Sequence, residues 1–259
     1  MNRIVIYLVL MLFASSCTST NKEPEANDNQ AEAMEIYLLI GQSNMAGRAE
    51  IETPDQDTLE GVFLYKGIVG DEWEKAVNPL NKYSSIRKKM SMQKLGPGYT
   101  FAREMASSRP GKQIGLVVNA KGGTSISLWK PGSEFYNEAV SRTKAAMQYG
   151  VLKGIAWHQG ESDASKYGSY TPKIIALIEA LRTEFNMPDL PFVAGQLSED
   201  KDSRIDFNKM IIQLPELIGN VSVVATDNTS TLDSTHFDTA SQRLLGRRYA
   251  SEMLKLLKE

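Results

Sequence analysis

A serine, a histidine and an aspartate of this chain have the types and spacing that nucleophilic chemistry requires. Ser43 stands in IYLLIGQSNMAGRAE, residues 36–50, where five apolar residues run straight into Gly-Gln-Ser-Asn. His236 stands in TLDSTHFD, with Asp233 three residues before it, so a tight turn would bring the carboxylate to the imidazole Nδ1. A serine becomes a nucleophile when a base removes its proton and an acceptor orients that base. We therefore predict that His236, oriented by Asp233, activates Ser43.

Attack on an acyl carbon also needs hydrogen-bond donors for the negative oxygen that develops. The predicted donors are the backbone N–H of Ser43, the backbone of Gly123 in NAKGGTSISLW, and the side-chain amide of Gln159 in IAWHQGESDAS. Two consecutive glycines let the backbone approach a substrate closely. A Gly-Gly pair is usually only a turn and a loop glutamine is usually only solvated. The prediction therefore rests on finding these donors together with the serine and the Asp-x-x-His pair.

These residues need elements that bring them together, and the sequence predicts such elements. Short apolar runs alternate with helical patterns, which implies parallel strands with right-handed crossovers, covered on both faces. We predict an α/β fold, a three-layer αβα sandwich with about five parallel strands, with residues 41–61 and 66–97 as surface loops or a small hairpin. The apolar runs are 36–40, 62–65, 114–118, 154–157, 191–194 and 221–225, and the helical patterns are 99–108, 133–150, 170–185, 203–214 and 239–258.

The predicted topology places the chemically interesting side chains on one rim, since ligands bind outside the carboxyl ends of parallel strands. Asn44 could contact a substrate or position its loop, and Trp129 could stack on a sugar or pack internally. His158 could pack in the rim or touch substrate. Its spacing to Glu161 and Asp163 makes a poor metal-ligand set, so we expect no metal and no cofactor.

Four blocks in order along the chain, GQSNMAG, KGGTSIS, WHQGESDA and DSTHFD…LLGRRYA, resemble those of the SGNH-hydrolase superfamily. They are most similar to the sialate O-acetylesterase domain and to the acetylxylan esterases of carbohydrate esterase family six, over about residues 34–256. The resemblance implies a flavodoxin-like sandwich, Ser43 as nucleophile, His236 as base, and Gly123 with Gln159 as oxyanion donors. Some members of this branch use the glutamate of the third block as the acid, here Glu161. The spacing within one loop favours Asp233.

The resemblance implies a serine esterase that removes O-acetyl groups from carbohydrates through an acetyl-serine intermediate. The sequence leaves open acetylated xylan, other hemicelluloses or O-acetylated sialic acid as substrate. The carboxylate of a sialic acid would require a cationic partner, for which Arg48, Lys121 and Lys130 are candidates. The alternatives are a glycan-binding lipoprotein without catalysis on the same fold, or a lipase or thioesterase of the same superfamily. The polar rim loops suit a sugar better than an acyl chain. The oligomeric state is open.

The first residues, MNRIVIYLVLMLFASSC, predict export. Arg3 precedes an apolar run about half as long as a bilayer span requires, which is typical of a signal peptide. The small residues before Cys17 resemble a bacterial lipobox, so we predict a lipoprotein signal peptide over residues 1–16 and lipidation of Cys17. A plain signal peptide or a short membrane anchor is the alternative.

The remainder of the chain divides at residue 33. Residues 17–33 are polar and predict a flexible tether, and residues 34–259 predict the esterase domain. We expect an exported protein, lipid-anchored to a bacterial membrane at the periplasmic face or the cell surface, with no other contact to the membrane. Its only cysteine excludes a disulfide within the chain, and a net charge of −2 without a basic cluster argues against a nucleic-acid partner.

Overall fold

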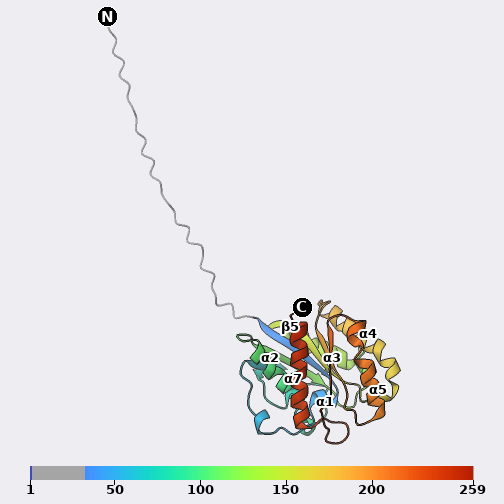
Figure 1. The fold of residues 1–259 in the computed structure, drawn as a ribbon. Coiled ribbons are helices and arrows are strands. Elements are labelled where there is room, and N and C mark those ends of the chain that lie inside the picture. Colours follow the sequence, from blue (N-terminus) through green and yellow to red (C-terminus); the bar gives the residue numbers. More distant parts are fainter. Residues whose placement is uncertain (2–32, 259) are drawn as a thin grey trace. The chain divides into compact units, whose positions relative to one another are not determined.

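A sheet with strand order β3-β2-β4-β1-β5-β6-β7 forms the centre of the fold (Figure 1). The computed structural model describes residue 1 and residues 33–258, so the predicted signal peptide, Cys17 and the predicted tether lie outside the described residues, apart from positions 1 and 33. The strands of the described part are β1 (Met34–Gly41), β2 (Val62–Ile68), β3 (Asp71–Lys75), β4 (Ile114–Ala120), β5 (Gly150–His158), β6 (Phe192–Gly195) and β7 (Val221–Val224).

The predicted α/β class is confirmed, but the sheet is mostly and not wholly parallel, and the predicted number of about five strands is too low. All six apolar runs form strands, and their pairings are parallel. The additional strand, β3, pairs antiparallel with β2 at the sheet edge. Its sequence, DEWEK, has one large apolar side chain, Trp73, which packs on Tyr65 with ring centroids 5.1 Å apart. An edge strand with one exposed face needs no apolar run, so the pattern of apolar runs did not predict β3. It does fall within residues 66–97, for which a small hairpin was one of the two predicted structures.

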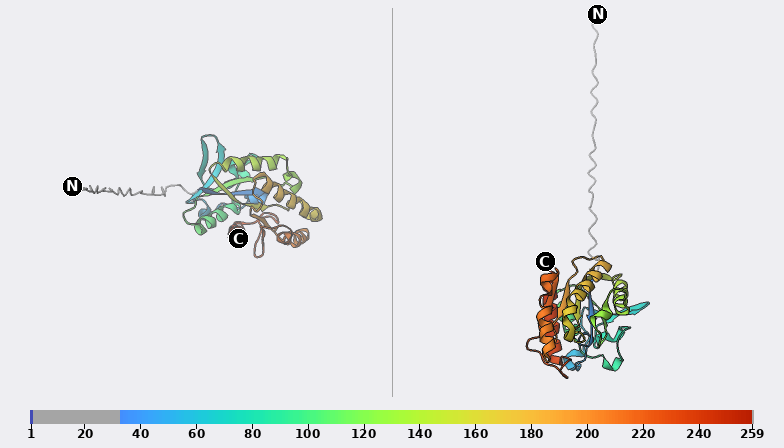
Figure 2. Two further views of the ribbon diagram at one scale, coloured as in Figure 1. Left: turned by 90° about the horizontal axis from the view of Figure 1, so that it is seen from above. Right: turned by 90° about the vertical axis from the view of Figure 1, so that its right-hand side faces the viewer.

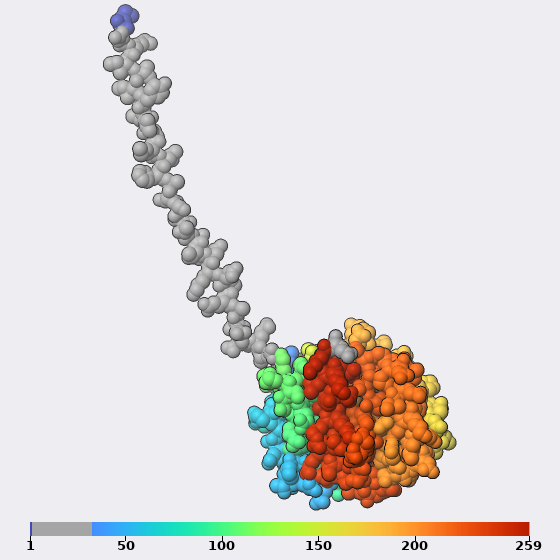
Figure 3. All heavy atoms as spheres, viewed as in Figure 1, coloured from blue at the N-terminus to red at the C-terminus, as the bar shows by residue number. Residues whose placement is uncertain are grey.

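Helices cover both faces of this sheet, as the views of Figure 2 show. On one face, α2 and α7 pack against each other, and in Figure 3 the red α7 lies beside the green residues of α2. Helices α3, α4 and α5 contribute to the core on the opposite face. The helices of the described part are α1 (Ser43–Ala46), α2 (Gly98–Ser108), α3 (Glu134–Ala146), α4 (Tyr170–Glu184), α5 (Asp202–Ile211), α6 (Leu214–Leu217) and α7 (Thr239–Leu256).

Strand β1 lies in the middle of the sheet and contributes to both cores. Ile36, Leu38 and Ile40 belong to the core under α3, α4 and α5, while Tyr37 and Leu39 belong to the core under α2 and α7. Successive side chains of a strand point to opposite faces, so a continuous apolar run is what a central strand of three layers needs. All eight residues of β1 are buried. This fixes the position of the segment that follows.

The chain leaves β1 at the point where the strand order reverses. Gly41 at the end of β1 pairs with Ala120 of β4 on one side and with His158 of β5 on the other. In open parallel sheets such a switch point forms a crevice at the carboxyl ends of the strands. The loops after β1, β4 and β5 therefore meet at one place. Within the described residues, no helix is long and apolar enough to span a bilayer.

Candidate active site

Ser43, His236 and Asp233 form a continuous hydrogen-bonded chain at this crevice. Ser43 is the first residue of α1, and its Oγ lies 3.0 Å from His236 Nε2. His236 Nδ1 lies 2.7 Å from Asp233 Oδ2. Asp233 Oδ1 accepts hydrogen bonds from the backbone N–H groups of Thr235 and His236. Burial of Asp233 acts to raise its pKa, but these hydrogen bonds from His236 and Thr235 outweigh it and hold the pKa below its ordinary value.

The alternative acid, Glu161, does not reach the imidazole of His236. Its Oε1 accepts a hydrogen bond from Asn44 Nδ2 and lies 4.0 Å from His158 Nε2. Within the described residues its Oε2 is buried and has no hydrogen-bond partner. The structure therefore brings Asp233, and not Glu161, into the position of the residue that orients the base.

Asn44 connects the turn that contains Ser43 to the loop that contains His236. Its Nδ2 donates to the carbonyl of Thr235 at 3.0 Å, and its Oδ1 accepts from the N–H of Phe237 at 3.1 Å. These are the two neighbours of His236 in the chain. Asn44 is 1% exposed and does not line the pocket, so the structure places it as a positioning residue and not in contact with substrate.

His158 is also removed from the pocket, because its side chain is fully buried. The hydroxyl of Tyr249 donates to the carbonyl of Trp157 at 2.8 Å, so its single hydrogen is occupied. The Nδ1–H of His158 then donates to that hydroxyl at 2.9 Å. Burial lowers the pKa of His158, which keeps the imidazole neutral, although the Glu161 carboxylate partly opposes this. Of the two roles that the sequence allowed for His158, the structure shows the packed one, and the proposed contact with substrate is not borne out, since His158 does not line the pocket.

Trp129 likewise lies in the core. It is 0% exposed, packs edge-on against Trp157 with ring centroids 5.4 Å apart, and its Nε1 donates to Thr124 Oγ1 at 3.1 Å. A buried indole with its N–H already paired has no free face for a sugar. Of the two roles that the sequence allowed for Trp129, the structure has the packing role.

Gln159 lies behind the pocket, and its amide hydrogens are occupied. Its Nε2 donates to the carbonyl of Thr124 at 2.8 Å, to Asp163 Oδ2 at 2.7 Å and to Gln42 Oε1 at 3.1 Å. Its Oε1 accepts from the hydroxyl of Tyr170 at 2.9 Å. Turning the amide over would place oxygen against two oxygens that can only accept. Gln159 is 1% exposed and does not line the pocket, so the structure does not place its amide as an oxyanion donor.

The amide that does face the pocket belongs to Gln42, which the sequence analysis did not single out. Its Oε1 accepts from Gln159 Nε2 and from Ser162 Oγ, so the amide orientation is fixed. Its Nε2 has no hydrogen-bond partner among the described residues, and Gln42 lines the pocket beside Ser43. The available signal was its position directly before the serine, but only the hydrogen-bond network shows which glutamine has free hydrogens.

Two backbone N–H groups complete the set of donors. Ser43 is the first residue of α1, so its N–H has no partner within the helix. Gly123 has a left-handed φ of 77° and lines the pocket, as does Gly122. Gly41, before Ser43, has a φ of 137°, and an added Cβ would lie 2.2 Å from the carbonyl oxygen of His158. Only glycine allows the chain to leave β1 in the direction that presents Ser43.

The pocket at this site has a volume of about 370 Å³. That size suits a small ligand such as a sugar, and its walls are polar rather than an apolar groove. Within the described residues no group of three or more His, Cys, Asp or Glu side chains could hold a metal ion. The lining residues are Gln42, Ser43, Arg48, Lys88, Met92, Gly122, Gly123, Glu161, Ser162, Lys201, Arg204, Thr235 and His236.

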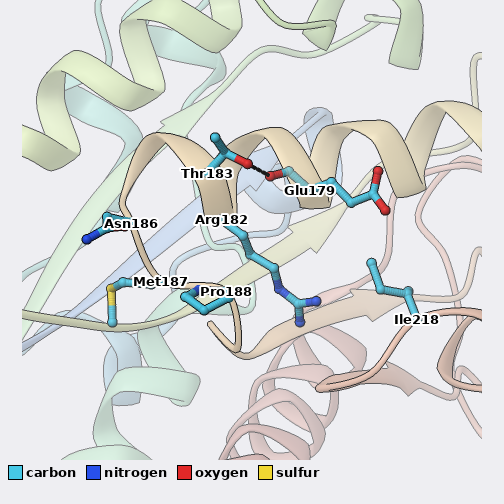
Figure 4. Close-up of a pocket in the computed structure, with 7 residues that line it drawn as sticks. All are labelled: Glu179, Arg182, Thr183, Asn186, Met187, Pro188 and Ile218. Carbon is cyan, nitrogen blue, oxygen red and sulfur yellow. Dashed lines mark hydrogen bonds between the residues drawn. The ribbon is translucent and has the colours of Figure 1, made fainter.

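A second hollow, lined by residues of α4 and the segment after it, has a structural explanation (Figure 4). The guanidinium of Arg182 points into it and donates to the backbone carbonyls of Leu190, Gly219 and Asn220. It therefore ties together the loops before β6 and β7. Neither a serine nor a histidine lines this hollow.

The fold and this pocket define a carboxylic ester hydrolase of the α/β type. A profile of the family described as "Carbohydrate esterase, sialic acid-specific acetylesterase" matches residues 33–255. The chain belongs to this family, whose fold is SGNH-like, as its sequence blocks predict.

Known proteins of similar sequence and structure agree with this assignment. A probable carbohydrate esterase of Arabidopsis thaliana is 32% identical over 183 residues, which cover 61% of this chain and 67% of that protein. Its X-ray structure has a TM-score of 0.77 at 28% identity and covers 86% of this chain and 99% of that one. A carbohydrate acetylesterase from Xanthomonas citri has the same fold, with a TM-score of 0.64 at 21% identity over 86% of this chain and 56% of that chain.

Proposed function

We propose that this protein is a serine esterase that removes acetyl groups from carbohydrate hydroxyls through an acetyl-serine intermediate. The observation that carries the proposal is the uninterrupted contact from Asp233 through His236 to Ser43 at the wall of a polar pocket. Membership of a carbohydrate esterase family supports acetylated sugars as the substrate class. Acetylated xylan and O-acetylated sialic acid are the candidates to compare.

The reaction runs in two halves. His236 removes the proton of Ser43 as Oγ attacks the acetyl carbonyl, and the imidazolium that forms is stabilised by Asp233. The proton then passes from His236 Nε2 to the sugar oxygen as the C–O bond breaks and the sugar leaves. In the second half a water molecule, deprotonated by His236, attacks the acetyl-serine. Acetate leaves and Ser43 recovers its proton.

The negative oxygen of each tetrahedral intermediate is bound by donors that are fixed before the substrate arrives. We assign this role to the N–H groups of Ser43 and Gly123 and to the Nε2 of Gln42, in place of Gln159. Gln159 acts indirectly, through Gln42. Its Nε2 donates to Gln42 Oε1, and this hydrogen bond orients the Gln42 Nε2 toward the pocket. Donors that need no rearrangement are the ones that accelerate the reaction most.

Acetate release by residues 34–259 tests the proposal, with acetylated xylan, an O-acetylated sialoside and a neutral aryl acetate as substrates. We expect Ser43→Ala to abolish release from all three. Thr229→Ala is the matched control: it also removes a hydroxyl, but from a residue that does not line the pocket, and it should retain activity. Release by Ser43→Ala at near the wild-type rate would refute the acetyl-serine mechanism.

We further propose that the chain is exported and anchored by a lipid on Cys17, on the sequence evidence of the signal peptide. Metabolic labelling with a radioactive fatty acid in a bacterial host tests this. We expect label in the wild-type chain and none in Cys17→Ser. Equal labelling of both, or of neither, would refute the anchor without touching the esterase proposal.

A further inference from the structure

Two methionines next to the pocket are exposed, although the proposed reaction uses neither. Met90 is 46% exposed and Met92 is 38% exposed. Between residues 33 and 258, every other methionine belongs to one of the two cores or packs against one. The thioethers of Met90 and Met92 are therefore the ones that a dissolved reagent reaches most easily in this part of the chain. The methionines of the cores are Met34, Met45, Met105, Met147, Met187, Met210 and Met253.

The backbone around Met92 is fixed by hydrogen bonds, so its side chain is held at one place. Arg48 Nη1 donates to the carbonyl of Met92 at 2.9 Å. The next residue, Gln93, is buried, and its Nε2 donates to the carbonyls of Lys88 and Lys89, both at 3.2 Å. The segment that carries Met92 is thereby closed on itself and tied to the turn that follows Ser43.

Of the two exposed methionines, Met92 lines the pocket that contains Ser43, and Met90 does not. Among the described residues that line this pocket, Met92 has the one side chain without any oxygen or nitrogen atom apart from the two glycines. It is therefore the apolar contact that the protein offers to a substrate bound there. A chemical change at its sulfur would change the character of that wall.

A thioether is open to such a change, because it is oxidised without help from a metal or an enzyme. The sulfur lone pair attacks one oxygen of hydrogen peroxide and the O–O bond breaks. The sulfur keeps that oxygen as a sulfoxide and loses two electrons, and the second oxygen leaves with both hydrogens as water. The product is polar, and its oxygen is a hydrogen-bond acceptor where the thioether was only a weak one.

Donors for a new acceptor are present in the same pocket. Arg48 and Lys88 both line it. Arg48 Nη2 lies close to Gly122, since a Cβ added there would be 2.6 Å away. Lys88 Nζ lies close to Gly123, where an added Cβ would be 3.5 Å away. A sulfoxide at Met92 therefore has cationic partners beside the two glycines next to the nucleophile.

We propose that Met92 is a reversible oxidation site that regulates the esterase. Hydrogen peroxide converts it to the sulfoxide, which lowers kcat/KM until a methionine sulfoxide reductase restores the thioether. This rests on the proposed function, because what is regulated is the binding of an ester at Ser43. The sulfoxide removes the apolar contact and bonds Arg48 or Lys88 across the pocket. It does not touch the hydrogen bonds between serine, histidine and aspartate, so the loss falls on KM more than on kcat.

The first test asks which methionines are oxidised. The full chain is treated with increasing amounts of hydrogen peroxide, digested with trypsin and analysed by tandem mass spectrometry. Cleavage after Lys89 and Lys94 gives the peptide MSMQK, residues 90–94, which contains both exposed sulfurs. We expect Met92 to gain its oxygen before Met105 and Met253, which are 0% exposed. Oxidation of these core residues at the same dose would refute the site.

The second test measures the effect on hydrolysis of a neutral aryl acetate. With Met90 and Met92 oxidised and the core methionines intact, we expect kcat/KM of the wild type to fall about tenfold, the value of about half of a buried methionine side chain. We expect kcat to change by no more than about threefold. Treatment with methionine sulfoxide reductase and a thiol should restore the starting value.

Variants assign the effect to one sulfur, each compared with its own activity before peroxide. Met92→Leu has no thioether at the pocket and should keep its kcat/KM within about twofold after treatment. Met90→Leu is the matched control, because it removes the other exposed thioether, and it should lose as much as the wild type. Met92→Gln places an amide where the sulfoxide oxygen would be, so its kcat/KM should be low without any peroxide.

Failure of this proposal differs from failure of the proposed function. If the untreated wild type releases no acetate from the aryl acetate, the proposed function is wrong. If it does release acetate, but oxidation at Met92 leaves kcat/KM unchanged, the esterase stands and the regulation is refuted. The regulation is also refuted if Met92→Leu loses as much activity as Met90→Leu, or if the reductase restores nothing.

Discussion

The assignment of the oxyanion donor to Gln42 makes a quantitative prediction. Gln42→Met keeps most of the volume of a side chain that is 2% exposed but removes its amide N–H. Removal of one fixed oxyanion donor costs about 10²–10³ in kcat, or roughly 2.7–4 kcal/mol. Because the donor acts on the charge that develops in the transition state, we expect KM to change by no more than about threefold.

A substitution of Gln159, the residue that donates to Gln42 Oε1, tests whether the two glutamines act together. In Gln159→Met the oxygen of Gln42 loses the donor that holds it at 3.1 Å, so its amide is no longer aimed. We expect a fall in kcat of about tenfold or more, and no further fall when this substitution is added to Gln42→Met, since the two residues act as one unit.

The assay is steady-state hydrolysis of an aryl acetate, with thermal unfolding of each variant to show that it is folded. Gln148→Met, at an exposed glutamine away from the pocket lining, is the matched control. The reasoning is refuted if Gln42→Met retains kcat within about threefold of the wild type. It is also refuted if Gln159→Met lowers kcat by the same factor with and without Gln42, which would make Gln159 an independent donor.

Three further predictions follow from contacts in the structure. Asp233→Asn should lower kcat by about 10²–10⁴. The new amide would donate to His236 Nδ1, so the proton of the imidazole would lie on Nε2, and Nε2 could not accept the proton of Ser43. Glu161→Gln, at a residue that does not contact His236, should lower kcat far less in the same assay. The lowered pKa of Asp233 means that its carboxylate stabilises the fold at pH values above its unfolded pKa, near 3.8, and that this contribution is lost as the pH falls through the folded pKa. Urea unfolding at pH 7 and at about pH 3 should therefore show the wild type losing its advantage over Asp233→Asn in acid, and an advantage that grows in acid would contradict the sign. Trp129→Ala should lower the free energy of unfolding by about 3–5 kcal/mol by denaturant titration, whereas Trp129→Phe, which keeps a ring in the core, should lose less and keep its activity.

The sequence predicted most of the sheet and several of the residues that the fold brings together around Ser43. Each of the six apolar runs is long enough and apolar enough to be a buried strand, and the four blocks follow strand ends, where a parallel sheet presents its ligands. The pairing of Asp233 with His236 was predictable for a similar reason, since it is local. Three residues in a tight loop leave few arrangements, and the structure has the contact at 2.7 Å.

What the sequence could not supply were contacts between segments far apart in the chain. Whether Gln42 or Gln159 has free amide hydrogens depends on Thr124, Asp163 and Tyr170, which come from three different loops and helices. The burial of residues beside the site depends in the same way on packing from distant elements.

Taken alone, then, the sequence predicted six of the seven strands of the described sheet and the contact between Asp233 and His236, because those follow from local pattern and short spacing. The roles of Ser43 as nucleophile and His236 as base stay predictions. Only the tertiary structure decided which polar side chains face the pocket and which lie beneath it. The physical reason is that exposure and hydrogen-bond saturation are properties of the surroundings of a residue. Lys88 illustrates this, since it lies in a loop without a sequence pattern and its Nζ comes close to Gly123 only in the folded chain.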